Sequence, residues 1–474
     1  MKNSTLGKLR AYWLGVGGVL TLASFVTDFR YSKAHATRVN SLAVGLQQAG
    51  AFLACFIVWP LADKLGRKKT LMLASAVFII GAIIETVNTH SMAAFYVGRV
   101  VAGVGLGAAS VVVPMFSSEM APKEIRGQIG SFFQLFYTFG IFTSYWVDYA
   151  VLKRISPHSS KQWQIPIGLQ IIPAALLGLG MFTLTESVRW LTKKGRHEEA
   201  WESLKWIRAD ESQATVEEME EIRVGVEMEL RATEGLEISE LFENPNLSRL
   251  GTAAAVFTAQ QATGATAFAY FGPQYFKLLV GGGDKDLLLT AIFGAIKVIA
   301  CSFFVLVLSD RVGRRKVLIW GAVFMAACQI TTAAVVKNKP PPASGGVTGS
   351  GIATVALIYL FVIAYNLSWG PLPWPYVSEI FPTRIREVGI AVGVSSQWLF
   401  NFVFSLTTPY MITNLGWGTF LLWGILDAVI AFCTFLFLKE TRGLSLEEIT
   451  HNDFQEARNH KVVDGEQFGA GRGI

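Results

Sequence analysis

Long apolar runs constrain this chain more than any other feature of its sequence. A transmembrane helix needs about 20 predominantly apolar residues. Twelve runs approach or exceed that length: 11–26, 42–62, 70–88, 92–115, 127–147, 163–184, 250–279, 287–309, 316–336, 351–378, 388–411 and 415–438. Charged residues make up only 16% of the chain, whereas a soluble domain carries about 25%. We therefore predict an all-α membrane protein of about twelve spans, with a shortened first helix.

The sequence also repeats itself. Asp-Lys-Leu-Gly-Arg-Lys at 63–68 returns as Asp-Arg-Val-Gly-Arg-Arg at 310–315, and a Glu-to-Arg loop containing proline at 119–126 returns at 379–386. Both motifs follow equivalent spans in the same order, which is typical of transporters built from repeated halves. We predict a six-helix half at 1–185, a cytosolic helical linker at 186–248, a second six-helix half at 249–438 and a cytosolic tail at 439–474.

Basic residues cluster in short loops between the apolar runs. Such clusters stay on the cytoplasmic side of a membrane. The clusters at 64–69, 123–126, 311–316 and 384–386 all fall on one side if the N-terminus is cytoplasmic, and the polar linker falls there too. This pattern predicts a multi-pass protein with both termini in the cytoplasm. We expect it in the plasma membrane, as a monomer.

Other function classes find no support. The net charge of +6 comes from the loop clusters and forms no basic stripe, so we expect no nucleic-acid partner. Cys55, Cys301, Cys328 and Cys433 lie inside apolar runs without metal-ligand spacing. The glycine-rich stretch 103–107 also lies in an apolar run, where close helix packing explains it better than nucleotide binding. We expect no metal, no cofactor and no enzymatic activity.

The repeated loops place acidic and basic residues at helix ends. Their glycine permits a tight turn, and the charges can bridge neighbouring helix ends in one conformation and release them in another. We predict that such charges form a cytoplasmic gate. Its members would be Asp63, Arg67, Glu119, Arg126, Glu186 and Arg189 in the first half, and Asp310, Arg314, Glu379, Arg386 and Glu440 in the second.

With these motifs the chain resembles the sugar porters of the major facilitator superfamily. The fourth run matches the family signature from Val101 through Gly107 and Glu119 to Arg126. Glu-Ser-Val-Arg-Trp-Leu at 186–191 and Glu-Thr-Arg-Gly-Leu-Ser at 440–445 resemble its other marks. The resemblance covers almost the whole chain. It implies an alternating-access carrier in the lipid bilayer for a small-molecule monosaccharide or a similar polyol.

Polar side chains inside apolar runs are the candidates for substrate contacts, because burying them unpaired in lipid is costly. By the resemblance, the family's sugar contacts fall on Gln134, Gln260, Gln261, Trp374, Gln397 and Asn401, and its outer gate on Tyr270 and Phe271. Thr266 stands where the family usually has Asn, and Asn366 stands where many members have an acid. We include both as substrate-binding candidates.

Charged residues inside spans cost about 2.5 to 3.5 kcal/mol each on insertion scales, so they are functional candidates. Lys297 could donate to a sugar hydroxyl, pair with a substrate carboxylate or form a structural ion pair. We expect a structural partner for Asp427 and an interfacial position for Glu85. In proton-coupled family members the residue matching Arg99 pairs with a first-span acid. Here the first span has no acid, so Arg99 is a coupling candidate without its usual partner.

These features predict the transport of a monosaccharide, hexose or pentose, by alternating access, with or without a coupled proton. The first alternative is a carrier of a hydroxy-acid such as quinate, which Lys297 favours. The second is a nontransporting sugar sensor, suggested by the short first span. The short tail after Leu438 argues against the sensor.

Overall fold

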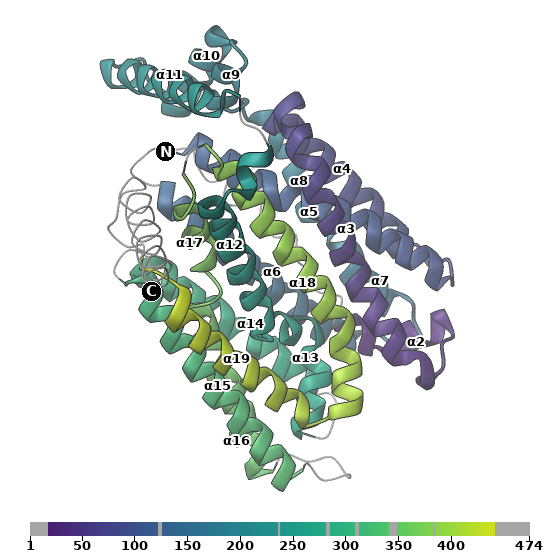
Figure 1. Ribbon diagram of the computed structural model, residues 1–474. Coiled ribbons are helices and arrows are strands. Elements are labelled where there is room, and N and C mark those ends of the chain that lie inside the picture. The colour runs from purple at the N-terminus through teal and green to yellow at the C-terminus, as the bar shows by residue number, and fades with distance from the viewer. Residues whose placement is uncertain are drawn as a thin grey trace, which may run out of the picture.

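The computed structural model describes residues 18–121, 126–235, 238–280, 285–308, 312–340, 348–382 and 384–440. Helices take up most of these residues, and no strand occurs among them. Figure 1 shows two adjacent groups of helices, purple to blue and teal to yellow, with a smaller third group at one end. The predicted all-α class is confirmed.

Each helix group follows the chain order. The first group consists of α2 (Ala23–Phe29), α3 (Ala36–Leu65), α4 (Arg67–Thr86), α5 (Met92–Met120), α6 (Arg126–Arg154), α7 (Lys161–Leu169) and α8 (Ile171–Gly180). The second consists of α12 (Asn244–Ala262), α13 (Ala265–Val280), α14 (Lys285–Phe303), α15 (Arg314–Asn338), α16 (Gly349–Leu367), α17 (Pro373–Glu379), α18 (Arg386–Leu415) and α19 (Gly418–Phe437).

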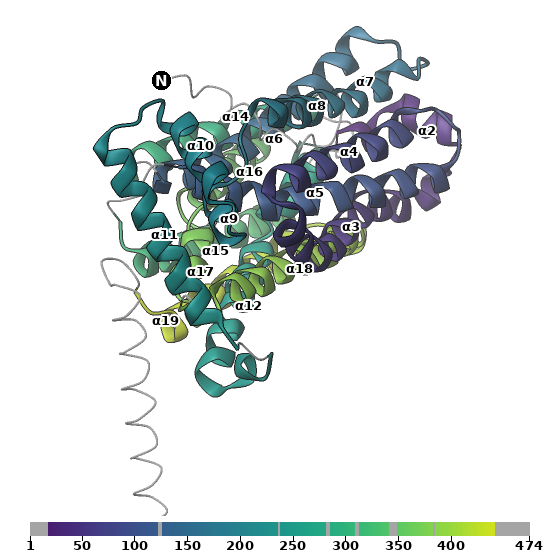
Figure 2. The same cartoon turned by 90° about the horizontal axis from the view of Figure 1, so that it is seen from above.

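The third group, the linker helices, consists of α9 (Val188–Lys193), α10 (His197–Arg208) and α11 (Gln213–Thr233). Seen along the bundle in Figure 2, α10 and α11 lie over its end. We call this end the linker side. A small apolar cluster that includes Val188, Trp190 and Leu204 holds these helices together.

Nine helices in the described part of the chain are long and apolar enough to cross a membrane. They are Ala36–Leu65, Arg67–Thr86, Met92–Met120, Lys161–Thr183, Lys285–Leu308, Arg314–Asn338, Gly349–Leu367, Arg386–Leu415 and Gly418–Phe437. The range Lys161–Thr183 includes α7 and α8, and Lys285–Leu308 includes α14. They correspond to the predicted second, third, fourth, sixth and eighth to twelfth runs.

The other three predicted runs take different forms. The first run lies partly outside the described residues; from Gly18 onward it holds the short helix Val19–Thr21 and the start of α2. The fifth run is α6, which continues to Arg154, seven residues beyond the predicted end at 147. The seventh run is divided between α12 and α13.

Breaks in two of the spans lie at glycine and proline. Gly264 separates α12 from α13 with φ +79°, a conformation that glycine adopts without steric cost. A Cβ there would lie 2.7 Å from the Trp423 ring. In the tenth span α16 ends at Leu367 and α17 begins at Pro373. The sequence Gly-Pro-Leu-Pro at 370–373 predicts a break at this place, because glycine is flexible and proline lacks a backbone N–H.

The glycines of α5 allow close packing against α3, as the sequence suggested. A Cβ on Gly103 would lie 2.1 Å from the Gln47 carbonyl oxygen, and one on Gly107 would lie 2.3 Å from the Ala51 carbonyl oxygen. No side chain larger than hydrogen fits at these distances. Helix backbones can therefore meet without intervening side chains, which holds α3 and α5 in a fixed register.

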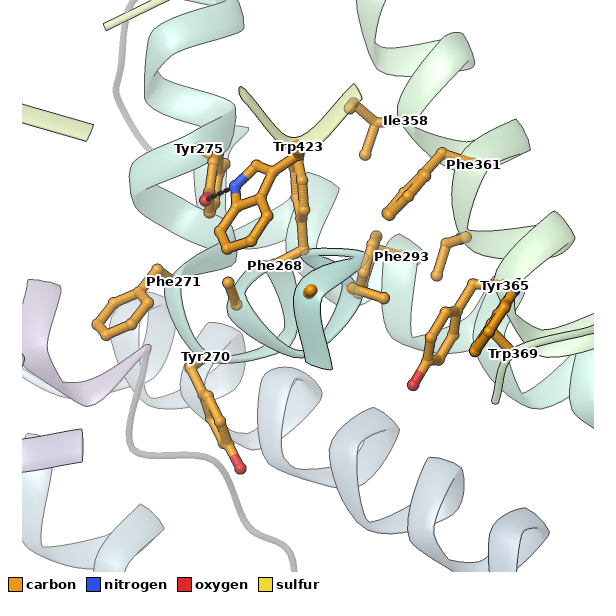
Figure 3. Close-up of a cluster of buried hydrophobic side chains, with 14 of the residues drawn as sticks. Phe268, Tyr270, Phe271, Tyr275, Phe293, Ile358, Phe361, Tyr365, Trp369 and Trp423 are labelled. Atoms are coloured by element: carbon orange, nitrogen blue, oxygen red, sulfur yellow. Dashed lines mark hydrogen bonds between the residues drawn. The ribbon is translucent and has the colours of Figure 1, made fainter. Parts of the chain in front are cut away.

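The two groups meet along α3 and α18 and along α6 and α14. Trp398 Nε1, on α18, donates to Ser110 Oγ on α5 at 3.2 Å. An aromatic cluster fills the second group: Phe268 stacks on Tyr275 with ring centroids 4.0 Å apart, and Trp423 Nε1 donates to the Tyr275 hydroxyl at 2.9 Å (Figure 3). This cluster fixes α13, which carries the predicted gate residues.

Candidate functional site

Three predicted amide side chains meet at the break in the tenth span. Gln260 Nε2, on α12, donates to the carbonyl oxygens of Trp369 at 2.9 Å and Gly370 at 3.0 Å. From α6, Gln134 Nε2 lies 3.4 Å from the place that a Cβ on Gly370 would take. Gln261 Nε2 donates to Gln260 Oε1 at 3.5 Å, and Gln261 Oε1 is buried without a partner among the described residues. The break thus gathers amides from both helix groups.

Lys297 lies near the middle of α14, enclosed by aromatic rings. Its Nζ is 5.6 Å from the ring centroid of Tyr137, 5.8 Å from that of Phe293 and 5.9 Å from that of Tyr365. The residue is 1% exposed, and within the described ranges no carboxylate pairs with it. Ring faces attract a cation but leave its charge in place. The structural ion pair foreseen as one alternative is therefore not formed among these residues.

The two predicted gate aromatics have different surroundings. The Tyr270 hydroxyl accepts from Asn401 Nδ2 at 3.5 Å, and Asn401 Oδ1 accepts from Ser405 Oγ at 3.2 Å. Figure 3 shows the Tyr270 hydroxyl pointing out of the aromatic cluster. Phe271 is fully buried, and its backbone is not helical. Tyr270, rather than Phe271, thus faces another predicted substrate residue.

Four further candidates lie in the second group. Thr266 faces the Tyr365 hydroxyl. Asn366 Nδ2 donates to the Val362 carbonyl oxygen at 2.7 Å within α16, and its Oδ1 is buried with no partner in the described ranges. The Trp374 ring meets the Phe257 ring edge-on, with centroids 5.0 Å apart. Gln397 is half-buried, and no described residue bonds to its Oε1. Their contact with a substrate stays a prediction.

Arg99 is paired with an acid that the sequence reading placed elsewhere. Its Nη1 lies 3.1 Å from Glu85 Oε2, its Nε donates to the Ala43 carbonyl oxygen at 2.7 Å, and its Nη2 donates to Gln47. Arg99 and Glu85 are 2% and 1% exposed. Glu85 is therefore enclosed within the first group, because α5 approaches α4 closely at Gly98, and the interfacial depth expected for it stays a prediction.

On the linker side, a charge cluster joins the helix ends of the first group. Arg67 donates from Nε and Nη2 to the Glu119 carboxylate at 3.0 to 3.2 Å. Glu186 accepts from the backbone N–H groups of Arg67 and Lys68. Burial raises the pKa of the Glu186 carboxyl, and these amide bonds oppose the shift. Glu186 thus caps the start of α4, while Glu119 holds the Arg67 side chain.

The second group has a matching cluster. Arg314 Nη2 lies 3.3 Å from Glu379 Oε1. Glu440 accepts from the backbone N–H groups of Arg314, at 2.8 Å, and Arg315, at 3.1 Å. The repeated motifs therefore form equivalent bonds at the starts of α4 and α15. These bonds join helix ends within each group, and a gate function remains a prediction.

The other predicted gate residues have varied positions. Asp63 accepts from Lys194 Nζ at 2.8 Å. Arg189 Nη2 pairs with Glu229 of α11 at 2.7 Å. Arg386 Nε donates to the Phe381 carbonyl oxygen at 3.3 Å. Asp310 and the side chain of Arg126 lie outside the described residues.

Sequence reasoning missed two buried polar residues and misjudged a third. Asp148 is fully buried on α6, and neither carboxylate oxygen has a hydrogen-bond partner among the described residues; the predicted span ended at 147, just before this residue. Gln48 is fully buried on α3, neither amide atom forms a hydrogen bond of good geometry within the same ranges, and its position in an apolar run was the available signal. The partner expected for Asp427 is absent among the described residues, because neither oxygen is hydrogen-bonded.

A cavity of about 210 Å³ lies between the end of α5 and the linker helices. Its lining includes the gate candidates Glu119 and Arg189 but none of the substrate candidates. Arg208 and Glu218, also in its wall, form a salt bridge with each other. This cavity belongs to the linker and lies apart from the amide site.

Comparison with known proteins places these features in a family. The family model described as "Sugar (and other) transporter" matches residues 8–452. A protein named "Probable quinate permease" from Aspergillus fumigatus is 34% identical over 450 residues, covering 92% of this chain and 82% of the relative. The "Quinate permease" of Emericella nidulans is 34% identical over 448 residues, covering 92% and 84%.

Solved structures agree with this assignment. The major facilitator proton:xylose symporter XylE, bound to 6-bromo-6-deoxy-D-glucose, is 25% identical with a TM-score of 0.75, covering 94% of this chain and 97% of that one. The partially occluded inward-open form of XylE from E. coli has a TM-score of 0.77 at 24% identity, covering 93% and 97%. The chain therefore belongs to the sugar transporter family and has the major facilitator fold.

Proposed function

We propose that this carrier binds a monosaccharide, hexose or pentose, between its two helix groups and moves it by alternating access. The observation that carries the proposal is the meeting of Gln134, Gln260 and Gln261 at the break beside Gly370. Gln134 comes from one group and the other two from the second. A substrate bound there would contact both groups, as alternating access requires.

The chemistry of these side chains suits a sugar. A hydroxyl both donates and accepts hydrogen bonds, and a carboxamide offers both partners. The unpaired buried oxygens of Gln261, Asn366 and Gln397 are acceptors that a set of hydroxyls would satisfy. An unpaired buried polar group costs about 1–3 kcal/mol, so substrate hydroxyls would relieve this cost. The indole of Trp374 supplies an aromatic face for the C–H surface of the ring.

A coupled proton is part of the proposal. The related XylE is described as a proton:xylose symporter, and intramembrane acids commonly serve proton relays in transporters. In this chain Glu85 occupies the place beside Arg99 that the first-span acid has in proton-coupled members. A proton on Glu85 would cancel its charge and weaken the bond to Arg99. The Arg99 guanidinium would then need a new partner, which favours a rearrangement of α3, α4 and α5.

A hydroxy-acid is the second candidate substrate. Lys297 carries a buried charge with no carboxylate partner in the described ranges, and burying a charge is costly unless it is paired. A substrate carboxylate would pair with it. The curated relatives named as quinate permeases, at 34% identity, support this candidate.

The membrane setting is also proposed. We place the protein in the plasma membrane as a monomer, with the linker side and both termini in the cytoplasm. Arg67 and Lys68 at the start of α4, and Arg314 and Arg315 at the start of α15, support this orientation, because basic loops stay cytoplasmic.

Uptake of labelled glucose, xylose and quinate by transporter-null cells tests the proposal, with surface expression confirmed and a protonophore in parallel samples. We expect saturable uptake of glucose or xylose that the protonophore abolishes. Uptake that ignores the protonophore would refute coupling and make the chain a facilitator. Uptake of quinate alone would select the second candidate. Surface protein that carries none of the three would overturn transport and favour a sensor.

A further inference from the structure

Helix α3 presents two successive glutamines to different neighbours. Gln47 accepts a hydrogen bond from Arg99, inside the first group. Gln48 shares a helix face with Ser41 and Gly45, since residues three, four and seven positions apart lie on one side of a helix. Ser41 Oγ donates to the Leu406 carbonyl oxygen at 2.5 Å. This face of α3 is therefore directed at α18 in the second group.

The packing of α3 on α18 places Gln48 beside predicted substrate residues. A Cβ on Gly45 would lie 3.3 Å from Leu406 Cδ1 and 3.7 Å from the Phe402 ring. The two helices run antiparallel, so one turn farther along α3 Gln48 comes level with Asn401. The Gln48 amide lies within reach of the Tyr270 hydroxyl, to which Asn401 also donates.

The Gln48 amide is enclosed but unused. The residue is 0% exposed, and neither amide atom forms a hydrogen bond of good geometry with any residue that the structure describes. Water cannot reach it at this burial, and a buried amide without partners is unfavourable. The unused donor and acceptor together match the hydrogen-bonding capacity of one or two hydroxyl groups.

We propose that Gln48 binds the hydroxyl groups of the substrate and extends the site from Asn401 and Tyr270 into the first helix group. This rests on the proposed transport of a hydroxyl-rich ring. Gln48 would donate from Nε2 and accept at Oε1, while Asn401 holds the same ligand from α18. Because one contact lies on each group, release of the ligand would loosen the contact between α3 and α18.

Gln329 provides a matched control. It is also fully buried, and neither amide atom has a partner in the part of the chain that the structure describes. It lies on α15, which packs on α16 and α19, and Gly424 of α19 closes over it. A purely structural effect of removing a buried amide would appear at both glutamines, whereas an effect on substrate would appear only at Gln48.

The experiment uses the full chain in proteoliposomes, with initial uptake rates of D-glucose, D-xylose and quinate. For the best substrate of the three, Gln48→Leu should raise KM by about threefold to tenfold, the range expected for one hydrogen bond, with kcat changed less. Gln48→Asn, which keeps the amide, should recover part of the loss. Gln329→Leu should leave KM unchanged.

Two results would overturn the proposal: a wild-type KM in Gln48→Leu, or an equal rise in Gln329→Leu. If Gln48→Leu does not fold, wild-type affinity in Gln48→Asn and in Gln48→Glu would also overturn it. Gln261→Ala separates this inference from the proposed function. A raised KM in Gln261→Ala with no effect at Gln48 would refute Gln48 alone. Unchanged KM in both would refute the proposed site as well.

Discussion

Replacing Lys297 with methionine separates the two candidate substrates. Methionine fills a similar volume among the Tyr137, Phe293 and Tyr365 rings and removes the charge. A hydrogen bond to a charged group contributes about 1.5–3 kcal/mol, which corresponds to about 10- to 150-fold in affinity. If the lysine binds a substrate carboxylate, quinate affinity should fall by that factor. A neutral sugar, which has no carboxylate, should lose less affinity, at most about the threefold to tenfold expected for one ordinary hydrogen bond.

Isothermal titration of the purified protein with quinate and with D-glucose measures both affinities. The melting temperature in detergent is the control. It should not fall, because the substitution removes a buried charge that has no carboxylate partner among the described residues. Equal losses for quinate and glucose would refute the carboxylate role. A lower melting temperature would show that Lys297 stabilises the fold through its charge.

Three further predictions concern the helix contacts. Glu85→Gln removes the charged partner of Arg99. It should abolish protonophore-sensitive accumulation of substrate but keep the exchange of labelled substrate across the membrane. Accumulation at the wild-type level would contradict coupling through Glu85. Gly103→Ala should lower the melting temperature, because the added Cβ would lie 2.1 Å from the Gln47 carbonyl oxygen. Gly225→Ala is the control and should not lower it, because a Cβ there has no atom within 4 Å. Glu119→Gln should destabilise the protein by about 3 kcal/mol in denaturant titration, since Arg67 is only 6% exposed.

The sequence predicted those features that depend on a single helix. Apolar length predicted the spans, and the Gly-Pro-Leu-Pro stretch predicted the break that now carries the Gln260 contacts. The repeated motifs predicted equivalent charges at the starts of α4 and α15. Each signal is local, because helix length, glycine conformation and the missing proline N–H act on neighbouring residues.

Features that depend on two helices were harder to predict. Glu85 lies near the end of its span, and only the close approach of α5 at Gly98 shows that it is enclosed beside Arg99. Asp148 was missed because a hydropathy run ends at a charged residue, whereas α6 continues to Arg154. Gln48 carried the same signal as Gln260, a polar residue in an apolar run, but its role depends on the register of α3 against α18.

The central claim is that the substrate is carried by a site that faces one side of the membrane at a time. Entrance counterflow tests it directly: proteoliposomes holding the purified protein are loaded with unlabelled D-xylose or D-glucose and diluted into a trace of the labelled sugar. A carrier should concentrate the label inside transiently above the outside level, because the loaded sugar competes for the inward-facing site. Label that only equilibrates, without such an overshoot, would contradict alternating access.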